Sequence, residues 1–140
     1  YDFEKVNFLI NSAHFLKVNL NELELINKLF KFNISDTYNL IMEILKRFNL
    51  KYVSITNGEI ESMIYDGSDF EITKSFKVNS IDNLGAGDNF LAALINELFV
   101  EKNNLKDSLR IASAYGAIAT TKKGAVPDIN HSELNEILNN

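Results

Sequence analysis

Short apolar runs of strand length alternate along this chain with longer segments whose apolar residues recur at helical spacing. Residues 15–18 and 52–56 are short runs rich in branched and aromatic side chains, which is typical of buried strands. Between them, the apolar residues of 40–48 repeat every three or four positions behind a candidate cap at Ser35 or Asp36, which predicts an amphipathic helix. Strands that alternate with helices indicate an α/β layered domain.

The same patterns predict the other elements. These are a helix that ends near residue 11, helices over 19–30, 88–101, 105–121 and 130–138, and strands at 62–65 and 70–73. Small residues dominate the helix expected over 105–121, so we expect it to pack closely against a neighbour or a ligand. The length of 140 residues, 46% of them hydrophobic, predicts one α/β domain over 1–140.

The composition excludes several classes of function. The chain contains no cysteine and two histidines, which excludes disulfides, thiolate metal sites and cysteine nucleophiles and leaves too few histidines for a histidine-built metal cluster. A net charge of −5 and the absence of a basic run argue against nucleic acid as a partner. The longest purely apolar run, 90–95, is far shorter than the roughly 20 residues of a membrane span. We expect a small anionic cytoplasmic domain without a membrane partner.

The first residues bear on how much of a protein this chain represents. The chain opens with Tyr1 and shows neither the charged n-region nor the apolar h-region of a signal peptide. Either the start is processed or the chain is a piece of a longer protein.

The segment Gly85-Ala86-Gly87-Asp88 is the sharpest candidate for chemistry. Its glycines let the backbone turn into a helix and leave N–H groups free at the helix N-terminus, where the helix dipole favours anions. Asp88 places a carboxylate beside this anion site, and accepting a proton from a hydroxyl that attacks phosphorus is a good reason for its presence. The alternative is a turn followed by an acid that favours the helix dipole. A dinucleotide-binding fingerprint fails because Phe90 replaces the third glycine, and no Walker A sequence occurs.

Asn19 and Glu22 form a second candidate. Their spacing fits a capping box, which is a sufficient structural explanation. The functional alternative is that the pair, at the carboxyl end of a strand, organises Mg²⁺ and its waters around a triphosphate, since Mg²⁺ needs few direct protein ligands.

Two further segments have simple structural interpretations. Thr56-Asn57-Gly58 is typical of a hairpin turn after a strand. The basic residues that precede Gly124, with Pro127 after it, are typical of a helix C-terminus capped by glycine.

Taken together, in this order and spacing, these segments resemble the ribokinase-like (PfkB) family of carbohydrate kinases, and fructokinases most closely. The family signature reads Asp-Thr-x-Gly-Ala-Gly-Asp, and residues 82–88 match it except that Asn83 replaces the threonine. The resemblance implies the C-terminal portion of a three-layer ribokinase-like α/β fold. It also implies that Asp88 is the catalytic base and that the Gly85, Ala86 and Gly87 amides form an anion hole for the γ-phosphate.

The resemblance assigns further residues to ATP and to cations. By it, Asn19 and Glu22 assist phosphate and Mg²⁺ binding, Glu22 through water. The family nucleotide motif falls on Thr56 and Gly58, although Glu61 stands where its final glycine is expected. Ser113 falls near the adenine pocket. In family members that use K⁺ or a similar cation, the site corresponds to Asp82, Leu84, Ala119 and Gly124.

The function implied by the resemblance is ATP-dependent phosphorylation of a sugar hydroxyl. Complete family members are about twice this length, so the chain matches their C-terminal half, and we expect it to be inactive alone and to pair with a missing N-terminal half or to form a homodimer. The alternatives are a non-catalytic nucleotide-binding or assembly module of the same fold, and a kinase for nucleosides or vitamin-like alcohols.

Overall fold

The structure is a computed structural model that describes residues 2–139. It divides into two compact units, one of residues 1–57 and 63–70 and the other of 58–62 and 71–140, which are described separately. The expectation of a single domain stays a prediction. The hydrogen-bonded strands follow the order β1 (Phe15–Asn19), β2 (Tyr52–Asn57), β3 (Glu61–Tyr65) and β4 (Phe70–Lys74).

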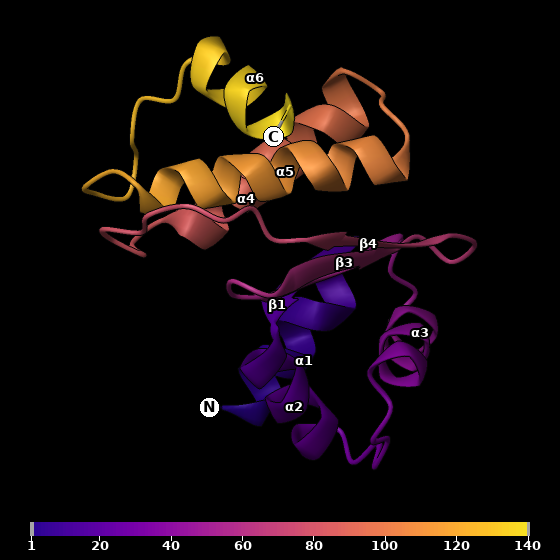
Figure 1. Ribbon diagram of the computed structural model, residues 1–140. Coiled ribbons are helices and arrows are strands. Elements are labelled where there is room, and N and C mark those ends of the chain that lie inside the picture. The colour runs from indigo at the N-terminus through magenta and orange to yellow at the C-terminus, as the bar shows by residue number, and fades with distance from the viewer. Residues whose placement is uncertain (1, 140) are drawn as a thin grey trace. The chain divides into compact units, whose positions relative to one another are not determined.

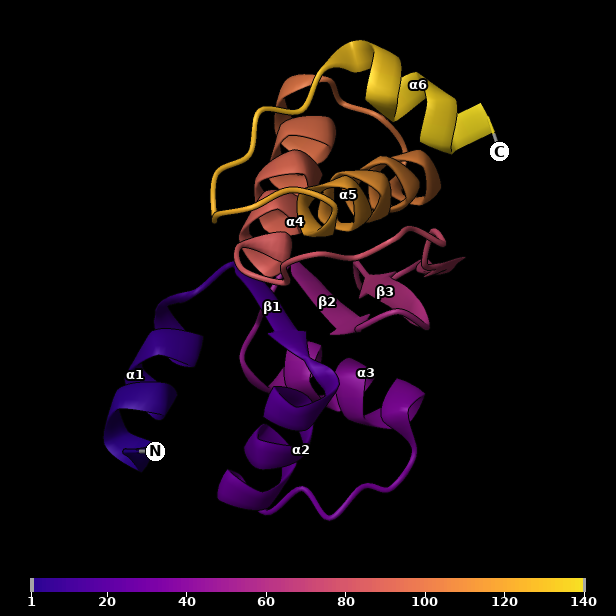
Figure 2. The ribbon, with the colours of Figure 1, turned by 60° about the vertical axis from the view of Figure 1, so that its left-hand side comes forward.

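The first unit is built around two parallel strands. β1 pairs with β2 from Phe15 opposite Tyr52 to Asn19 opposite Thr56, and its helices are α1 (Phe3–Ser12), α2 (Leu20–Leu29) and α3 (Thr37–Arg47). Figure 2 shows α2 and α3 on the same side of these strands. The parallel pairing and the crossover through helices confirm the α/β prediction.

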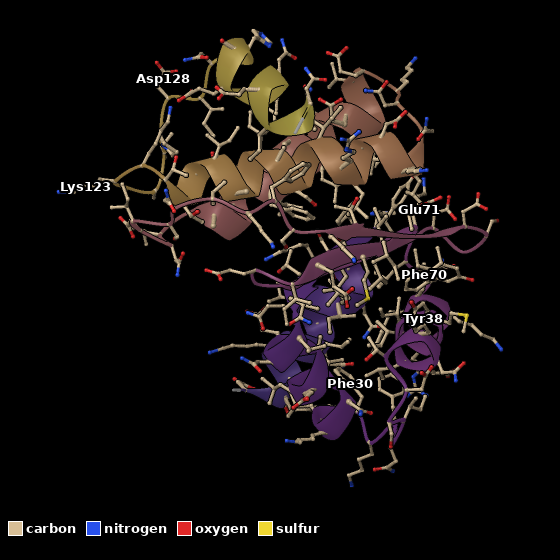
Figure 3. The ribbon with its side chains drawn as sticks, in the orientation of Figure 1. Phe30, Tyr38, Phe70, Glu71, Lys123 and Asp128 are labelled. Atoms are coloured by element: carbon tan, nitrogen blue, oxygen red, sulfur yellow. The ribbon has the colours of Figure 1, made fainter. Side chains whose placement is uncertain are left out.

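The core of the first unit includes the residues that the periodicity singles out. Leu40, Ile41 and Ile44 of α3 are buried and pack with residues of the strands, including Val53 and Ile55. Burying each such side chain contributes about 1.5–3 kcal/mol. Of the two candidate caps, the structure uses Asp36, whose carboxylate accepts the Asn39 N–H at 2.8 Å. At one margin of this unit, the Tyr38 ring lies beside that of Phe70 (Figure 3), with 4.5 Å between the ring centroids.

The second unit is a group of packed helices. These are α4 (Ala86–Ile95), continued by the π-helical turn η1 (Asn96–Val100), then α5 (Leu105–Thr120) and α6 (His131–Asn139). α4 lies against α5, and α6 lies beside α5 (Figure 1). A Cβ on Gly116 of α5 would stand 3.3 Å from the Phe90 Cβ and 3.4 Å from the Ala86 carbonyl oxygen. The small residues of α5 therefore permit the close packing that the sequence predicts.

Two helix boundaries differ from expectation. The helix expected to start at Asp88 starts at Ala86, because Gly85 takes the left-handed conformation, with φ of +79°, at the cap position. Asp88 is therefore the third residue of α4. The helix expected to end at a glycine cap ends at Thr120, capped by Thr121 in an ordinary helical conformation. Gly124, with φ of +91°, belongs to the loop that follows.

No helix within residues 2–139 has the length and apolar character needed to cross a membrane.

Candidate active site

The N-terminus of α4 presents free backbone donors. The N–H groups of Gly87 and Asp88 have no hydrogen-bond partner among the described residues, and the Ala86 N–H makes only a long bond, 3.4 Å, to the Asn83 carbonyl. These donors lie at the positive end of a ten-residue helix, where an anion is stabilised by the donors and by the helix dipole. The Asp88 side chain is exposed and makes no hydrogen bond with the described residues, so its carboxylate is available to solvent or substrate.

Asp82 fastens this loop to the one after α5. Its Oδ1 accepts the Leu84 N–H at 2.9 Å, and its Oδ2 accepts the Gly124 N–H at 3.1 Å, across 42 residues of sequence. These two bonds hold the pKa of the Asp82 carboxyl below its ordinary value of 3.8, and the bond from Leu84 has the larger effect. The structure thus brings together three of the four residues assigned to a monovalent cation.

The fourth residue of that set, Ala119, is buried near the end of α5, and its carbonyl accepts the Lys122 N–H at 3.3 Å. Within residues 2–139, no group of three or more acidic or histidine side chains is arranged to hold a metal ion. The cation site stays a prediction.

The lowered pKa of Asp82 predicts a pH dependence of stability. The unfolded chain binds a proton here more readily than the folded chain, so the stabilisation is present above about pH 4 and is lost as the pH falls through the folded pKa. We expect Asp82→Asn to lower the melting temperature at pH 7 and to make its fall between pH 5 and pH 3 shallower, as measured by circular dichroism. Glu133→Gln is the positive control. Lys122 and the Asn130 N–H also lower the pKa of Glu133, so the melting temperature of this variant should fall less steeply as well. A slope for Asp82→Asn equal to that of the wild type would contradict the assignment.

The same two loops touch directly at Gly85. A Cβ on this residue would stand 2.2 Å from the Ala125 carbonyl oxygen, so only glycine fits. The side chain of Asn89, one turn into α4, donates from Nδ2 to the Gly85 carbonyl at 2.8 Å and to the Ala125 carbonyl at 3.1 Å. Sequence reasoning missed Asn89, for which the available signal was a polar residue four positions after Gly85, directly before the apolar run 90–95.

The loop after α5 is also held at its far end. Lys122 Nζ forms an ion pair with Glu133 of α6, 2.8 Å apart, and donates to the carbonyl of Asp128. Figure 3 shows Lys123 and Asp128 along this loop. Asn130 caps α6 reciprocally with Glu133, with both bonds at 3.0 Å, which confirms the predicted cap.

The capping box predicted for Asn19 and Glu22 is present. Asn19 Oδ1 accepts the Glu22 N–H at 2.9 Å, and Glu22 Oε2 accepts the Asn19 N–H at 2.8 Å. A cap of this kind stabilises a helix by about 1 kcal/mol. It occupies one oxygen of Glu22, and Oε1 makes no hydrogen bond with the described residues. The magnesium role of this pair stays a prediction.

The nucleotide motif begins beside this capping box. Asn19 and Thr56 are register partners at the carboxyl ends of the parallel strands β1 and β2, which is the edge of a parallel sheet where ligands usually bind. In the second unit, Gly58 is exposed with φ of +52°, and its carbonyl accepts the Ser75 hydroxyl at 2.9 Å. Glu61, which replaces the final glycine of the motif, is half-buried on β3.

Ser113, predicted near adenine, lies inside the second unit. The residue is 7% exposed, and its hydroxyl donates to the Leu109 carbonyl at 2.8 Å and lies 2.6 Å from the Ser62 hydroxyl. Its nucleotide role stays a prediction. The second unit also has an open depression, and Asp88 is not among the residues that line it. It is lined by Asn89, Ala92, Ala93, Asn96, Glu97 and Tyr115.

Comparison with known proteins places this site in a family. The family model described as pfkB family carbohydrate kinase matches residues 3–132. The chain belongs to this family. Fructokinase-1 of Zea mays is 34% identical over 126 residues, which cover 85% of this chain and 37% of the maize protein. The predicted family, with its likeness to fructokinases, is therefore confirmed.

Solved structures of the family have the same fold. A fructokinase from Vibrio cholerae O395, solved with fructose, ADP and calcium, is 25% identical with a TM-score of 0.81, over 97% of this chain and 44% of the other. A protein from Escherichia coli named "putative Ribokinase II", solved with ATP and Mg²⁺, is 23% identical with a TM-score of 0.74, over 87% of this chain and 37% of the other. The ribokinase-like fold is thus confirmed. The chain covers less than half the length of each of these proteins, 37% of the maize protein and 44% of the Vibrio cholerae one.

Proposed function

We propose that this chain carries the phosphoryl-transfer apparatus of an ATP-dependent sugar kinase that phosphorylates fructose or a closely related carbohydrate. The observation that carries the proposal is the pair of free N–H groups at the start of α4 beside the exposed carboxylate of Asp88. The identity to maize fructokinase-1 supports fructose as the acceptor.

In the proposed reaction, the sugar hydroxyl oxygen attacks the γ-phosphorus of ATP and the bond from that phosphorus to the bridging oxygen of ADP breaks. The hydroxyl proton passes to the Asp88 carboxylate. The amides of Gly85, Ala86 and Gly87 stabilise the charge that develops on the transferred phosphoryl oxygens. Because a helix N-terminus is already oriented, these donors need no rearrangement during the reaction.

The residues of the first unit fit a role in holding MgATP. The capping box leaves Glu22 Oε1 without a hydrogen bond among the described residues, and Thr56 lies beside Asn19 at the strand ends. An oxygen donor of this kind suits Mg²⁺ that keeps most of its waters. When bound, Mg²⁺ neutralises charge on the phosphates. A K⁺-like cation near Asp82 and Gly124 is part of the same proposal.

A second candidate is a non-catalytic nucleotide-binding or assembly module of the same fold. It is favoured by Glu61, which stands at the end of the nucleotide motif on β3, since a carboxylate near triphosphate oxygens is unfavourable.

Titration calorimetry and a phosphorylation assay separate the two functions. We expect the gene product that contains residues 1–140 to bind MgATP and to transfer phosphate to fructose, with adenosine as the control acceptor. We expect residues 1–140 alone to show little or no turnover, because phosphoryl transfer requires both reactants to be held about 3–3.5 Å apart. MgATP binding by the gene product without transfer to any sugar would support the second function and contradict the first. Phosphorylation of adenosine instead of fructose would indicate that the enzyme is a nucleoside kinase.

A further inference from the structure

The side-chain amide of Asn89 donates one hydrogen bond to each of two loops that are distant in sequence. One bond reaches the Gly85 carbonyl at 2.8 Å, and the other reaches the Ala125 carbonyl at 3.1 Å, across 36 residues of sequence. The Gly85 carbonyl also accepts the Asn89 backbone N–H at 2.9 Å. Asn89 therefore binds the Gly85 carbonyl twice and ties the segment 82–87, here called the glycine loop, to the loop after α5.

Fixing these carbonyls also fixes the N–H groups on the same peptides. A peptide group is planar and trans, so its N–H points opposite to its C=O. The direction of the Gly85 carbonyl thus sets the direction of the Ala86 N–H, and the Ala125 carbonyl sets that of the Val126 N–H. Ala86 is one of the proposed anion-hole donors, and it has little else to orient it, since its bond to the Asn83 carbonyl is long, 3.4 Å.

The fastening matters because the glycine loop has no side-chain cap. Gly85 makes no side-chain cap bond at the start of α4, and its left-handed backbone is a conformation that glycine exchanges freely for others. Contact with Ala125 restricts it on one side, since a Cβ there would lie 2.2 Å from the Ala125 carbonyl oxygen. The Asn89 amide keeps the two loops at that separation.

We infer that Asn89 is a positioning residue for phosphoryl transfer, which orients the anion-hole amides by hydrogen-bonding the Gly85 and Ala125 carbonyls. This inference rests on the proposed kinase function. It assigns Asn89 no contact with the reacting atoms. An electrostatic site acts only when its donors are fixed before charge develops, so loosening the loop lowers the rate of transfer more than the affinity for sugar.

Three substitutions test the inference in the complete gene product. Asn89→Ala removes both side-chain bonds and leaves the backbone N–H bond to the Gly85 carbonyl. Asn89→Ser can restore the bond to the Gly85 carbonyl, four residues back on the helix, but cannot span to Ala125. Asn96→Ala is the matched control, because Asn96 lies on the same helical run and, within residues 2–139, its side-chain amide donates only to Glu97, at 3.1 Å.

We expect Asn89→Ala to lower kcat about 10- to 100-fold with the KM for fructose within about threefold of the wild type, the scale of a loss of positioning. The kcat of Asn89→Ser should lie between that of Asn89→Ala and that of the wild type. The kcat of Asn96→Ala should match the wild type. Inorganic phosphate, titrated while the amide resonances of Ala86 and Gly87 are observed by NMR, should bind at least about fivefold more weakly to Asn89→Ala. Circular dichroism identifies variants that fail to fold. If Asn89→Ala fails to fold, Asn89→Ser is compared with the wild type in its place.

A kcat for Asn89→Ala within about twofold of the wild type, or an equal fall in Asn96→Ala, would overturn the inference. If the wild type phosphorylates no sugar, the proposed function fails and the phosphate titration decides alone. Weaker phosphate binding by Asn89→Ala than by Asn96→Ala would then still support the fastening of the loop, and equal binding would overturn it.

Discussion

Asp88→Asn is expected to lower kcat for sugar phosphorylation by the complete enzyme about 10²–10⁴-fold, the usual contribution of a well-placed general base. The expected cost in stability is small. Asp88 is exposed and makes no hydrogen bond with the described residues, so the variant loses only the attraction of a carboxylate to the helix dipole, a few tenths of a kcal/mol. Steady-state kinetics with fructose and MgATP, together with a melting curve, measure the two effects separately.

The chain offers a matched control for this substitution. Asp107 is the third residue of α5, as Asp88 is the third residue of α4. Asp107→Asn removes an acid from the same position of a neighbouring helix and should leave kcat close to that of the wild type. If Asp88→Asn retains most of the activity, Asp88 is not the base and the proposed mechanism fails at its central step.

Gly85→Ala is expected to destabilise the protein by about 3 kcal/mol or more. A left-handed backbone costs a residue with a Cβ about 1–2 kcal/mol. The added Cβ would also lie 2.2 Å from the Ala125 carbonyl oxygen and 2.6 Å from the Ala125 Cα, so backbone would have to move. For a chain of this size we expect the melting temperature to fall by roughly 10 °C, given about 3–4 °C per kcal/mol. Urea unfolding gives the free energy directly.

Gly124→Ala separates backbone strain from the close approach. Gly124 has φ of +91°, but a Cβ there would meet nothing within 4 Å, so its loss should be limited to the strain of about 1–2 kcal/mol. The same holds for Gly58, with φ of +52° and open space around it. Equal losses at Gly85 and Gly124 would mean that the contact between Gly85 and Ala125 does not exist in solution.

The sequence predicted those features whose determinants lie close together in the chain. The Asp36 cap of α3, the reciprocal cap of Asn130 and Glu133, and the buried stripe of α3 each depend on residues within a few positions of one another. The family resemblance could be predicted because its signature, residues 82–88, is contiguous. Comparison with maize fructokinase-1 and the family model confirmed it.

The features that could not be predicted depend on partners far along the chain or on small shifts in the backbone. The bond of Asp82 to Gly124 crosses 42 residues, and that of Asn89 to Ala125 crosses 36. The partners in these bonds are a backbone N–H and a backbone carbonyl. Nearly every residue has these groups, so the residue type does not identify the partner. The start of α4 at Ala86 depends on the conformation of one glycine, and its π-helical continuation places Glu97 among buried residues, which periodicity does not reveal.

The two long-range bonds at the glycine loop have a consequence for the order of folding. Closing a loop of about forty residues costs conformational entropy before any contact can repay it, so the segment around Asp82 meets that around Gly124 only when the intervening helices have docked. After dilution from denaturant, helical ellipticity should therefore return first and the ability to bind phosphate last. A newly made chain would therefore form the contacts of Asp82 with Gly124 and of Asn89 with Ala125 among its last steps of folding.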